Sequence, residues 1–483
     1  MIVVKYCQIH QPVASQRVVL CLILQDLLFN LAKLFVWWYN TTVVINNFAF
    51  LFWSVSKMSY SNLTKSELTA ELAELSQQYE GFVEKGLTLD MSRGKPCTEQ
   101  LDICLPMLDV LNSSVSCKSA NGFDLRNYGI LDGIPECKAL MSQLIQVRPE
   151  QVMIGGNSSL NMMFDAIACM MTTPIVEGAT PWFNVPDRKF LCPVPGYDRH
   201  FSVTGYFGFE MIPVPMTAEG PDMDIVEELV KNDASIKGIW CVPKYANPTG
   251  ITYSDETVRR FACLQPAAKD FRIMWDDAYC VHDIADEGDK LLSLMDECEK
   301  AGNPDLPIIF CSTSKVSFPG SGVAAMATSE NNMKVFKARY TNQTIGFDKL
   351  NMLRHLLFFK DFDGIKAHMM KHKDILKPRF ETVISKFEEQ LASCEIASWT
   401  NPRGGYFVSI NVYPGTAKAV VKMCKEAGLV LTPAGATFPG GFDPEDSNIR
   451  IAPSYPPVEE LKMAMDVFCT CVRICAIQKI LSE

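Results

Sequence analysis

Residues 308–322 read Ile308-Ile-Phe-Cys-Ser-Thr-Ser-Lys315-Val-Ser-Phe-Pro-Gly-Ser-Gly322, and the interpretation of the whole chain starts from this stretch. The first four residues are apolar and predict a short buried strand, whereas the hydroxyl-rich and glycine-rich remainder predicts a loop. A lysine in such a loop, just past a buried strand, is well placed for Schiff-base chemistry. Taken alone, however, Lys315 would more often be a surface lysine.

Three loops earlier in the chain also follow predicted strands. They are Gly155-Gly-Asn-Ser-Ser159 after Val152–Ile154, Ala246-Asn-Pro-Thr-Gly250 after Gly238–Val242, and Asp276-Asp-Ala-Tyr279 after Arg272–Trp275. Because strands and helices alternate between about 150 and 330, we expect a mostly parallel sheet with helices on both faces. Ligands of open α/β sheets bind at the carboxyl ends of the strands, where all four loops would lie.

Each of these three loops has a feature that suits a ligand. Glycines near Gly156 would let backbone N–H groups approach an anion at a helix N-terminus. Pro248 restricts Asn247 to an extended backbone, and Asp276 at a buried strand end needs a cationic partner such as a protonated ring nitrogen. Tyr279 can donate a hydrogen bond from its phenol. Taken individually, the first two loops could be ordinary turns, and the third could be a pair of acids exposed to solvent.

Together, the four loops resemble the fold type I pyridoxal-phosphate aminotransferases, the aspartate aminotransferase superfamily. The order is the same: a Gly-rich turn, N-P-T-G, D-x-A-Y and S-x-S-K. The lysine loop is most similar to a bacterial-type aspartate aminotransferase subgroup that reads S-T-S-K-x-S/T-F-P-G. The resemblance covers roughly residues 63–475 and does not include residues 1–57.

This resemblance implies pyridoxal 5'-phosphate as cofactor and transfer of an α-amino group between an amino acid and a 2-oxo acid. The best guess for the pair is aspartate and 2-oxoglutarate, reacting through an internal aldimine, a quinonoid and a ketimine. The alternatives are an aromatic or broad-specificity aminotransferase, a lyase, decarboxylase or racemase of the same fold, and a non-catalytic regulator. The resemblance also implies a homodimer.

The resemblance assigns cofactor roles residue by residue. Lys315 would form the internal aldimine and move the proton, and Asp276 would keep the pyridine nitrogen protonated. Asn247 and Tyr279 would bond the ring 3-oxygen, and Tyr197 would stack on the ring. The phosphate would be held by Gly156, Asn157, Ser158, Ser312 and Ser314, and by Tyr128 from across the dimer interface.

For the substrate, the resemblance implies that Arg450 grips the α-carboxylate as a planar fork. Asn247 would also contact the substrate, and Gly94 would lie in a loop that covers it. A dicarboxylate needs a second cation, for which Arg93, Arg126 and Arg354 are unranked candidates.

One position departs from the family pattern. Most relatives have an arginine that pairs with the phosphate shortly after the lysine loop, but Gly322 occupies that position here. Either Asn157 and the serines suffice for the phosphate, or another cation substitutes.

The expected fold class is α/β, with a large domain built on a mostly parallel, seven-stranded-type sheet flanked by helices. Beyond about 335 the pattern changes to long helices and isolated strands, which are expected near 364–393, 416–427 and 457–481 and at 406–411 and 449–452. We therefore expect an N-terminal arm at 58–110 that contributes to a smaller α+β domain, a large cofactor-binding domain at 111–360 and a small domain at 361–483.

Residues 1–57 differ from the rest of the chain. They carry four basic residues and one acid, whereas the remainder carries 41 basic and 54 acidic residues. Their apolar stretches, Val18–Tyr39 and Val43–Val55, fit neither a spanning helix nor a secretory signal well, since Asp26 and Lys33 interrupt the first. We expect an atypical hydrophobic extension that is disordered or non-native, with a membrane anchor and a cleaved targeting segment as alternatives.

Composition excludes several other classes. Of the 483 residues, 48% are hydrophobic and the net charge is −10 without any basic run, so nucleic acid is a poor partner. The 18 cysteines contain no C-x-x-C, which favours free thiols in a reducing, cytoplasmic compartment. No P-loop, G-x-G-x-x-G, H-E-x-x-H or G-x-S-x-G motif occurs. The six histidines are expected to form no ligand cluster, so no metal is expected.

Overall fold

The computed structural model describes residues 59–483, of which residues 60–483 form one compact unit. The expectations for residues 1–57 therefore lie outside the described residues. None of the helices in the described part of the chain is long and apolar enough to cross a membrane.

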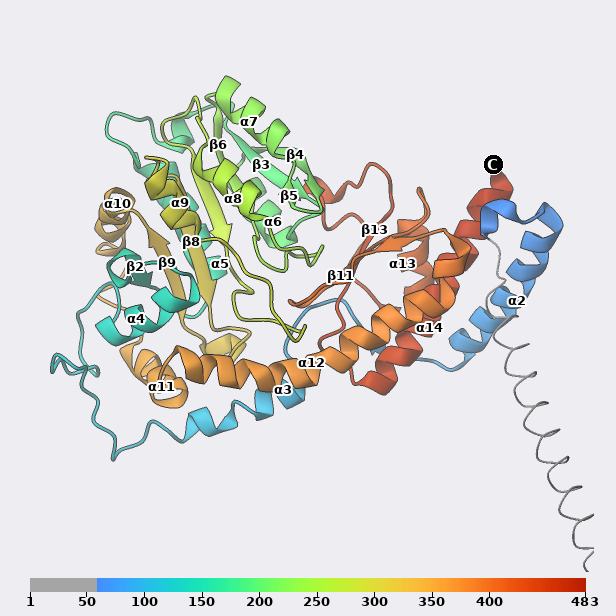
Figure 1. The fold of residues 1–483 in the computed structure, drawn as a ribbon, viewed down its shortest axis with the longest axis horizontal. Helices are drawn as coiled ribbons and strands as arrows, with labels where there is room; N and C mark the ends of the chain where they lie inside the picture. The colour runs from blue at the N-terminus through green and yellow to red at the C-terminus, as the bar shows by residue number, and fades with distance from the viewer. Residues whose placement is uncertain (1–58) are drawn as a thin grey trace, which may run out of the picture. The chain divides into compact units, whose positions relative to one another are not determined.

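An eight-stranded sheet lies at the centre of the larger domain, in the order β2-β9-β8-β7-β6-β3-β4-β5 (Figure 1). Its strands are β2 (Val152–Ile154), β3 (Lys189–Val194), β4 (Glu210–Thr217), β5 (Gly220–Pro221), β6 (Ile236–Cys241), β7 (Arg272–Asp276), β8 (Pro307–Ser312) and β9 (Ala324–Thr328). Strands β3, β4, β6, β7 and β8 pair in parallel, whereas β9 is antiparallel to both of its neighbours. The expected seven-stranded arrangement is confirmed, with the two-residue β5 as an additional edge strand.

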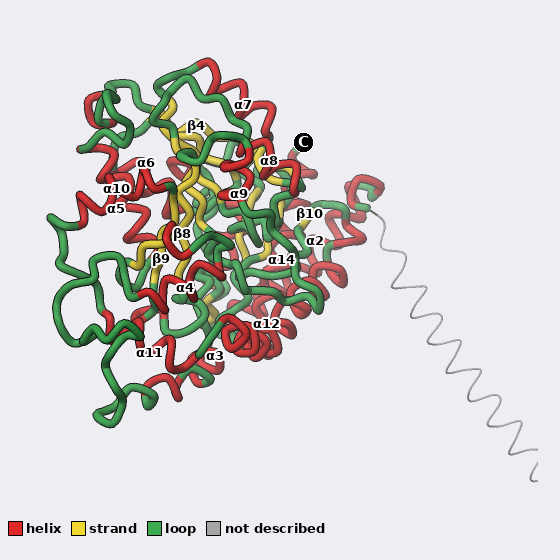
Figure 2. The backbone as a smooth tube through the Cα atoms, turned by 60° about the vertical axis from the view of Figure 1, so that its left-hand side comes forward, coloured by secondary structure: helices red, strands yellow, loops and turns green. Residues whose placement is uncertain are grey.

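Helices cover both faces of this sheet (Figure 2). They are α4 (Pro135–Leu144), α5 (Ser159–Thr172), α6 (Asp198–Tyr206), α7 (Met223–Asn232), α8 (Asp255–Ala262), α9 (Leu294–Lys300), α10 (Glu330–Tyr340) and α11 (Lys349–Phe359). Successive residues of a strand point to opposite faces, and accordingly Ile273 and Trp275 join one hydrophobic cluster while Met274 joins another. All five residues of β7 are buried, as expected for a strand covered on both sides.

The smaller domain combines segments from both ends of the described chain. Its elements are β1 (Leu89–Asp90), β10 (Ser398–Trp399), β11 (Val408–Asn411), β12 (Leu429–Val430), β13 (Asn448–Ile451), α2 (Lys65–Glu84), α3 (Thr98–Asp102), α12 (Phe362–Gln390), α13 (Ala417–Glu426) and α14 (Val458–Ser482). Strand β1 pairs in parallel with β12, and Arg473 of α14 contacts both Tyr60 and Glu71. The expectation that N-terminal and C-terminal segments build this domain together is confirmed.

The 29-residue helix α12 belongs to both domains. Ile365 and Met369 join a hydrophobic cluster of the large sheet, whereas Phe380 and Val383 join the core of the smaller domain. Pro378 lies inside the helix, in the part that packs into the smaller domain, since Leu376 also belongs to that core. The expected boundary at residues 360 and 361 therefore falls just before an element that both cores share, and the proposed domain limits remain predictions.

Phe387 tests the packing of the smaller domain. Its fully buried ring lies 5.2 Å from the ring of Trp399 and 5.9 Å from that of Phe468, measured between centroids. We expect Phe387→Ala to lower the free energy of unfolding by about 3–5 kcal/mol because it removes buried contacts and leaves a cavity. Chemical denaturation measures this loss. The exposed Glu388→Ala on the same helix should change stability by less than about 0.5 kcal/mol, and similar losses in the two variants would contradict the proposed packing.

Candidate active site

One cavity of about 960 Å³ brings together residues from all four predicted loops. It is lined by Gly94, Ser158, Tyr197, Asn247, Asp276, Tyr279, Ser312, Ser314, Lys315 and Arg450. Lys315 follows β8, Asp276 ends β7 and Arg450 lies on β13 of the smaller domain. The cavity therefore combines residues of the large-sheet strand ends and of the smaller domain.

Asp276 is a buried carboxylate with only one of its two oxygens paired. Its Oδ2 lies 3.1 Å from His200 Nε2, and the His200 ring stacks on Trp240 with 4.3 Å between centroids. Its Oδ1 is buried and has no hydrogen-bond partner. A buried carboxylate oxygen in this state suits a cationic N–H donor that enters the cavity. No sequence pattern indicates His200, which follows Tyr197 by three residues but belongs to no recognisable motif.

The Lys315 side chain is held among aromatic rings. Its Nζ lies 4.7 Å from the ring centroid of Tyr279 and 6.0 Å from that of Tyr406. Burial lowers the pKa of the Lys315 amine below its usual range, although the nearby Asp276 carboxylate partly opposes this shift. A lower pKa increases the fraction of neutral amine, which is the form that attacks a carbonyl.

The glycine-rich turn before α5 is open to an anion. Gly156 has a φ of +59°, a left-handed conformation that favours glycine. Ser158 is the N-cap of α5, yet its side chain does not cap the helix, so the first-turn N–H groups lack this partner. Ser312 Oγ donates to Ser314 Oγ, which in turn donates to the Asn157 carbonyl at 3.0 Å. These contacts join the turn to the lysine loop.

The Asn157 side chain contacts the lysine loop. Its Nδ2 donates to the Gly320 carbonyl at 2.9 Å, which leaves the second N–H of the amide and the backbone N–H for an anion. Its expected role at the phosphate stays a prediction. A β-carbon at Gly322 would lie 3.1 Å from the Ser314 nitrogen and 3.3 Å from the Asn157 carbonyl oxygen. A side chain at position 322 would therefore require these two backbone segments to move apart by a few tenths of an ångström.

Arg450 is buried and partly paired. Its Nη1 donates to Asp198 Oδ1 at 3.0 Å and to Asn247 Oδ1 at 3.2 Å, and its Nη2 donates to Thr432 Oγ1 at 3.3 Å. Its Nε has no hydrogen-bond partner.

Gly94, which also lines the cavity, packs closely against Phe407. A β-carbon at position 94 would lie 2.5 Å from a ring carbon of Phe407, which leaves no room for a side chain.

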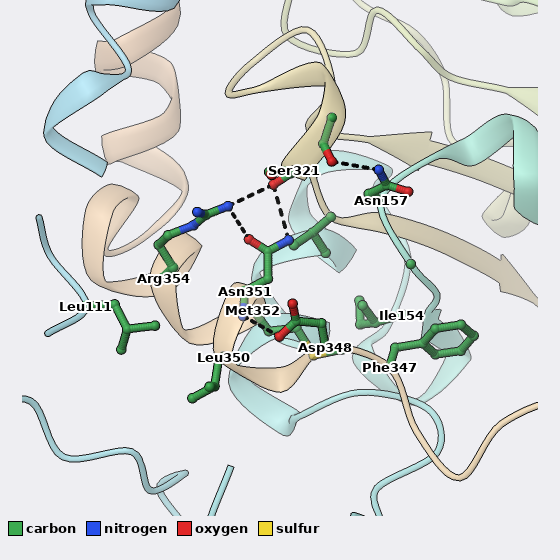
Figure 3. A pocket seen from close by; sticks show the side chains of 13 residues that line it. Leu111, Ile154, Asn157, Ser321, Phe347, Asp348, Leu350, Asn351, Met352 and Arg354 are labelled. Carbon is green, nitrogen blue, oxygen red and sulfur yellow. Dashed lines mark hydrogen bonds between the residues drawn. The ribbon is translucent and has the colours of Figure 1, made fainter. Parts of the chain in front are cut away.

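The structure separates the three candidate cations for a second carboxylate. Arg93 lines the cavity, and so does Lys425, which the sequence analysis did not name. Arg126 is exposed and pairs with Asp124 through two hydrogen bonds. Arg354 lines a different cavity of about 430 Å³ and donates to the Ser321 carbonyl, as Figure 3 shows. Arg93 is thus the only one of the three that lines the main cavity.

Tyr128 does not line this cavity in the single chain. Its side chain is 78% exposed, which is unusual for a large aromatic residue. The expected contact with a phosphate across a dimer interface is neither formed nor excluded within one protomer, and it stays a prediction.

The residues of the cavity fit pyridoxal phosphate on three separate counts. The unpartnered Asp276 Oδ1 suits a protonated ring nitrogen, and the uncapped N-terminus of α5 suits a phosphate. Lys315, from the loop after β8, supplies a buried amine for covalent attachment. This donor set corresponds to the three chemical parts of that group.

Comparisons with known proteins agree with this arrangement. A family model described as aspartate amino-transferase matches residues 63–483. An aspartate aminotransferase of Corynebacterium glutamicum is 45% identical over 403 residues, covering 83% of this chain and 93% of that protein. The crystal structure of an aspartate transaminase from the same species matches with a TM-score of 0.85 and 43% identity, covering 88% of this chain and 100% of that chain. The α-aminoadipate aminotransferase of Thermus thermophilus shares the fold, with 20% identity and a TM-score of 0.65 over 87% of this chain and 99% of that chain.

The carboxyl group of Asp277, next to Asp276, should make the stability of the folded protein depend on pH. Burial raises the pKa of its carboxyl to about 7, although Lys244 opposes the shift. At a pH between about 4, the pKa of this carboxyl in the unfolded chain, and its pKa in the folded protein, only the unfolded chain loses the proton. The free energy of unfolding therefore falls as pH rises. Between pH 5 and pH 8 this group should lower the free energy of unfolding by on the order of 2 kcal/mol.

We expect the Asp277→Asn variant to lack this contribution. Its free energy of unfolding, relative to that of the wild type, should therefore rise between pH 5 and pH 8 in denaturant titrations. A constant difference between the two proteins would show that Asp277 ionises normally in the folded state.

Proposed function

We propose that this chain, which belongs to the aspartate aminotransferase family, transfers the α-amino group of aspartate to 2-oxoglutarate with pyridoxal phosphate as cofactor. The chain is an aminotransferase, and it acts on amino acids and 2-oxo acids. One observation supports this proposal most directly. Asp276, one of whose oxygens has no hydrogen-bond partner, lines the same cavity as Lys315 and Arg450.

The side chains that line the cavity indicate which residues would hold the cofactor. Asp276, braced by His200, would accept a hydrogen bond from the ring nitrogen, and Tyr197 would lie against the ring. Asn247 and Tyr279 are the polar side chains available to the ring oxygen. The phosphate would lie at Gly156 and Ser158, near Ser312 and Ser314 of the lysine loop. When bound, pyridoxal phosphate supplies an electron sink that stabilises negative charge at the substrate α-carbon.

Lys315 would serve both as the attachment point and as the proton carrier. Its amine is buried, and burial lowers its pKa, which favours the neutral form that can act as a base. Asp276 stays close enough to counter a positive charge on the lysine, since its carboxylate partly opposes the lowered pKa. The lysine amine would thus be the group that takes the proton from the substrate α-carbon.

Arg450 would orient the substrate through its α-carboxylate. Two of its nitrogens donate to protein oxygens, while Nε has no partner. An incoming carboxylate can bind this planar group if it replaces the Asp198 contact, which is a charge-for-charge exchange. Arg93 and Lys425 line the same cavity and are the available cations for a distal carboxylate.

An aromatic amino acid is the second candidate donor. Phe407, Val430 and Leu431 also line the cavity and offer apolar surface to a ring. These residues make an aromatic donor the informative comparison in any test of substrate choice.

A donor panel with 2-oxoglutarate tests this function. We expect aspartate to be the best donor, with phenylalanine and tyrosine well below it, because only a dicarboxylate can use Arg93 or Lys425. Product formation and visible absorbance of the bound cofactor are the measurements. Lys315→Ala should lose both the activity and the borohydride-fixable attachment, whereas Lys334→Ala, an exposed lysine of α10, should keep both. Faster turnover of an aromatic donor would overturn the aspartate assignment, and a fixable adduct in Lys315→Ala would overturn the lysine assignment.

We also propose a homodimer in which Tyr128 completes the phosphate site of the partner subunit. The support is its high exposure in one protomer together with the family match.

Mixing two variants tests the shared site. A Lys315→Ala chain paired with a Tyr128→Phe chain forms one site with neither substitution, so refolded mixtures should regain about one quarter of wild-type activity. Activity is compared with that of each variant refolded alone. If the mixture shows only the mean of the two separate variants, Tyr128 acts within its own chain or not at all.

A further inference from the structure

Cys104, His368 and His372 meet in the buried interior behind the lysine loop. One ligand atom of each lies within 4.8 Å of the others, and all three side chains are buried. The sequence-based interpretation that the histidines form no ligand cluster is therefore wrong. His368 and His372 share one face of α12 at a spacing of four residues, but Cys104 precedes His368 by 264 residues, so no local motif announces the cluster.

Two distances within the cluster are close to those between the ligands of a tetrahedral zinc ion, and the distance from Cys104 to His372 is at most 4.8 Å. His368 Nε2 lies 3.0 Å from His372 Nε2 and 3.5 Å from Cys104 Sγ. Zinc–nitrogen and zinc–sulfur bonds at tetrahedral angles place two nitrogens ~3.3 Å apart and a nitrogen and a sulfur ~3.6 Å apart.

A fourth ligand atom is also in place. The carbonyl oxygen of Val316 lies 3.0 Å from His368 Nε2 and 3.6 Å from Cys104 Sγ. The four atoms are one cysteine sulfur, two imidazole nitrogens and one backbone carbonyl oxygen. The sulfur and the two nitrogens are the donor types that structural zinc sites use, and the carbonyl oxygen would fill the fourth position.

Gln100 also contacts this cluster. The Cys97 N–H donates to Gln100 Oε1, and Gln100 Nε2 lies 2.9 Å from His372 Nδ1. His368 Nε2 lies 3.0 Å from both His372 Nε2 and the Val316 carbonyl oxygen, so two nitrogens and one oxygen converge in the buried interior. A cation at this point would contact all three atoms.

The ligand atoms are shielded from bulk solvent, since Cys104, His368 and His372 are all buried. The Cys104 thiol gives up its proton when a metal ion binds the sulfur.

We propose that Cys104, His368, His372 and the Val316 carbonyl bind one zinc ion. The Cys104 sulfur loses its proton to solvent as the zinc–sulfur bond forms, and both histidines ligate through Nε2. His372 Nδ1 then carries the ring proton, which requires the Gln100 amide to turn so that Oε1 accepts it in place of the Cys97 N–H. Such a turn also lets Tyr406, now 2.9 Å from Gln100 Nε2, donate to Oε1.

The zinc site would fix the position of the lysine loop. Val316 directly follows Lys315, Cys104 lies just beyond α3, and the two histidines lie on α12. None of the four ligand residues lines the cavity of about 960 Å³, so the ion would have a structural role outside the reacting groups.

Metal analysis of the holoenzyme tests the proposal without any measurement of activity. Protein is loaded with ZnCl₂, freed from excess zinc by gel filtration and assayed by atomic mass spectrometry. We expect one zinc per chain in the wild type and in Cys137→Ala, which changes another buried cysteine. Cys104→Ala and His372→Gln should each retain less than one tenth of that amount.

Cobalt gives a second measurement, which can be made on the wild type alone. Co²⁺ in the wild type should produce a thiolate-to-metal charge-transfer band. A wild type that retains no zinc, a Cys104→Ala that retains as much as the wild type, or a cobalt spectrum without the thiolate band would overturn the site. Because these measurements involve no substrate, failure of the zinc site and failure of the proposed aminotransferase reaction remain distinguishable.

Discussion

The Asp276 carboxylate ends a strand in which every residue is buried, and the active-site architecture depends on keeping this charge there. A buried carboxylate is costly unless polar partners surround it. His200 supplies one partner at 3.1 Å and is itself held by its stack on Trp240 of β6, the strand next to β7. The remaining oxygen has no partner in the protein, so the ligand that enters the cavity has to provide one. The parallel register, which pairs Asp276 with Phe310, places the start of the lysine loop beside this charge.

The parts of the site that the sequence predicts are those that a local pattern defines. Lys315, Asp276 and Asn247 each follow a short apolar strand, and parallel strands necessarily end at one edge of the sheet. The strand pattern alone therefore predicts that these three residues converge, and all three line the same cavity. The capping of α8 by Ser254 is equally local, since its side chain accepts from the Thr257 N–H.

The parts that the sequence does not predict depend on contacts between distant segments. His200 meets Asp276 across 76 residues, and Cys104 meets His368 across 264, without a spacing that links either pair. Gly322 could be recognised as a departure from the family pattern, but only the structure relates it to two backbone segments that lie within 3.3 Å of a β-carbon there. Similarly, the antiparallel direction of β9 leaves no mark in a strand whose five residues are all buried.

The shared helix α12 has a mechanical consequence. Its first turns are packed into the core of the large sheet and its later turns into the core that carries Arg450, so neither core can rotate against the other without bending this helix. A proline has no N–H for the carbonyl four residues earlier, so Pro378 removes one hydrogen bond from the part of the helix that packs into the smaller domain. Any change in the separation of Arg450 and Asp276 would therefore have to be accommodated by bending of α12.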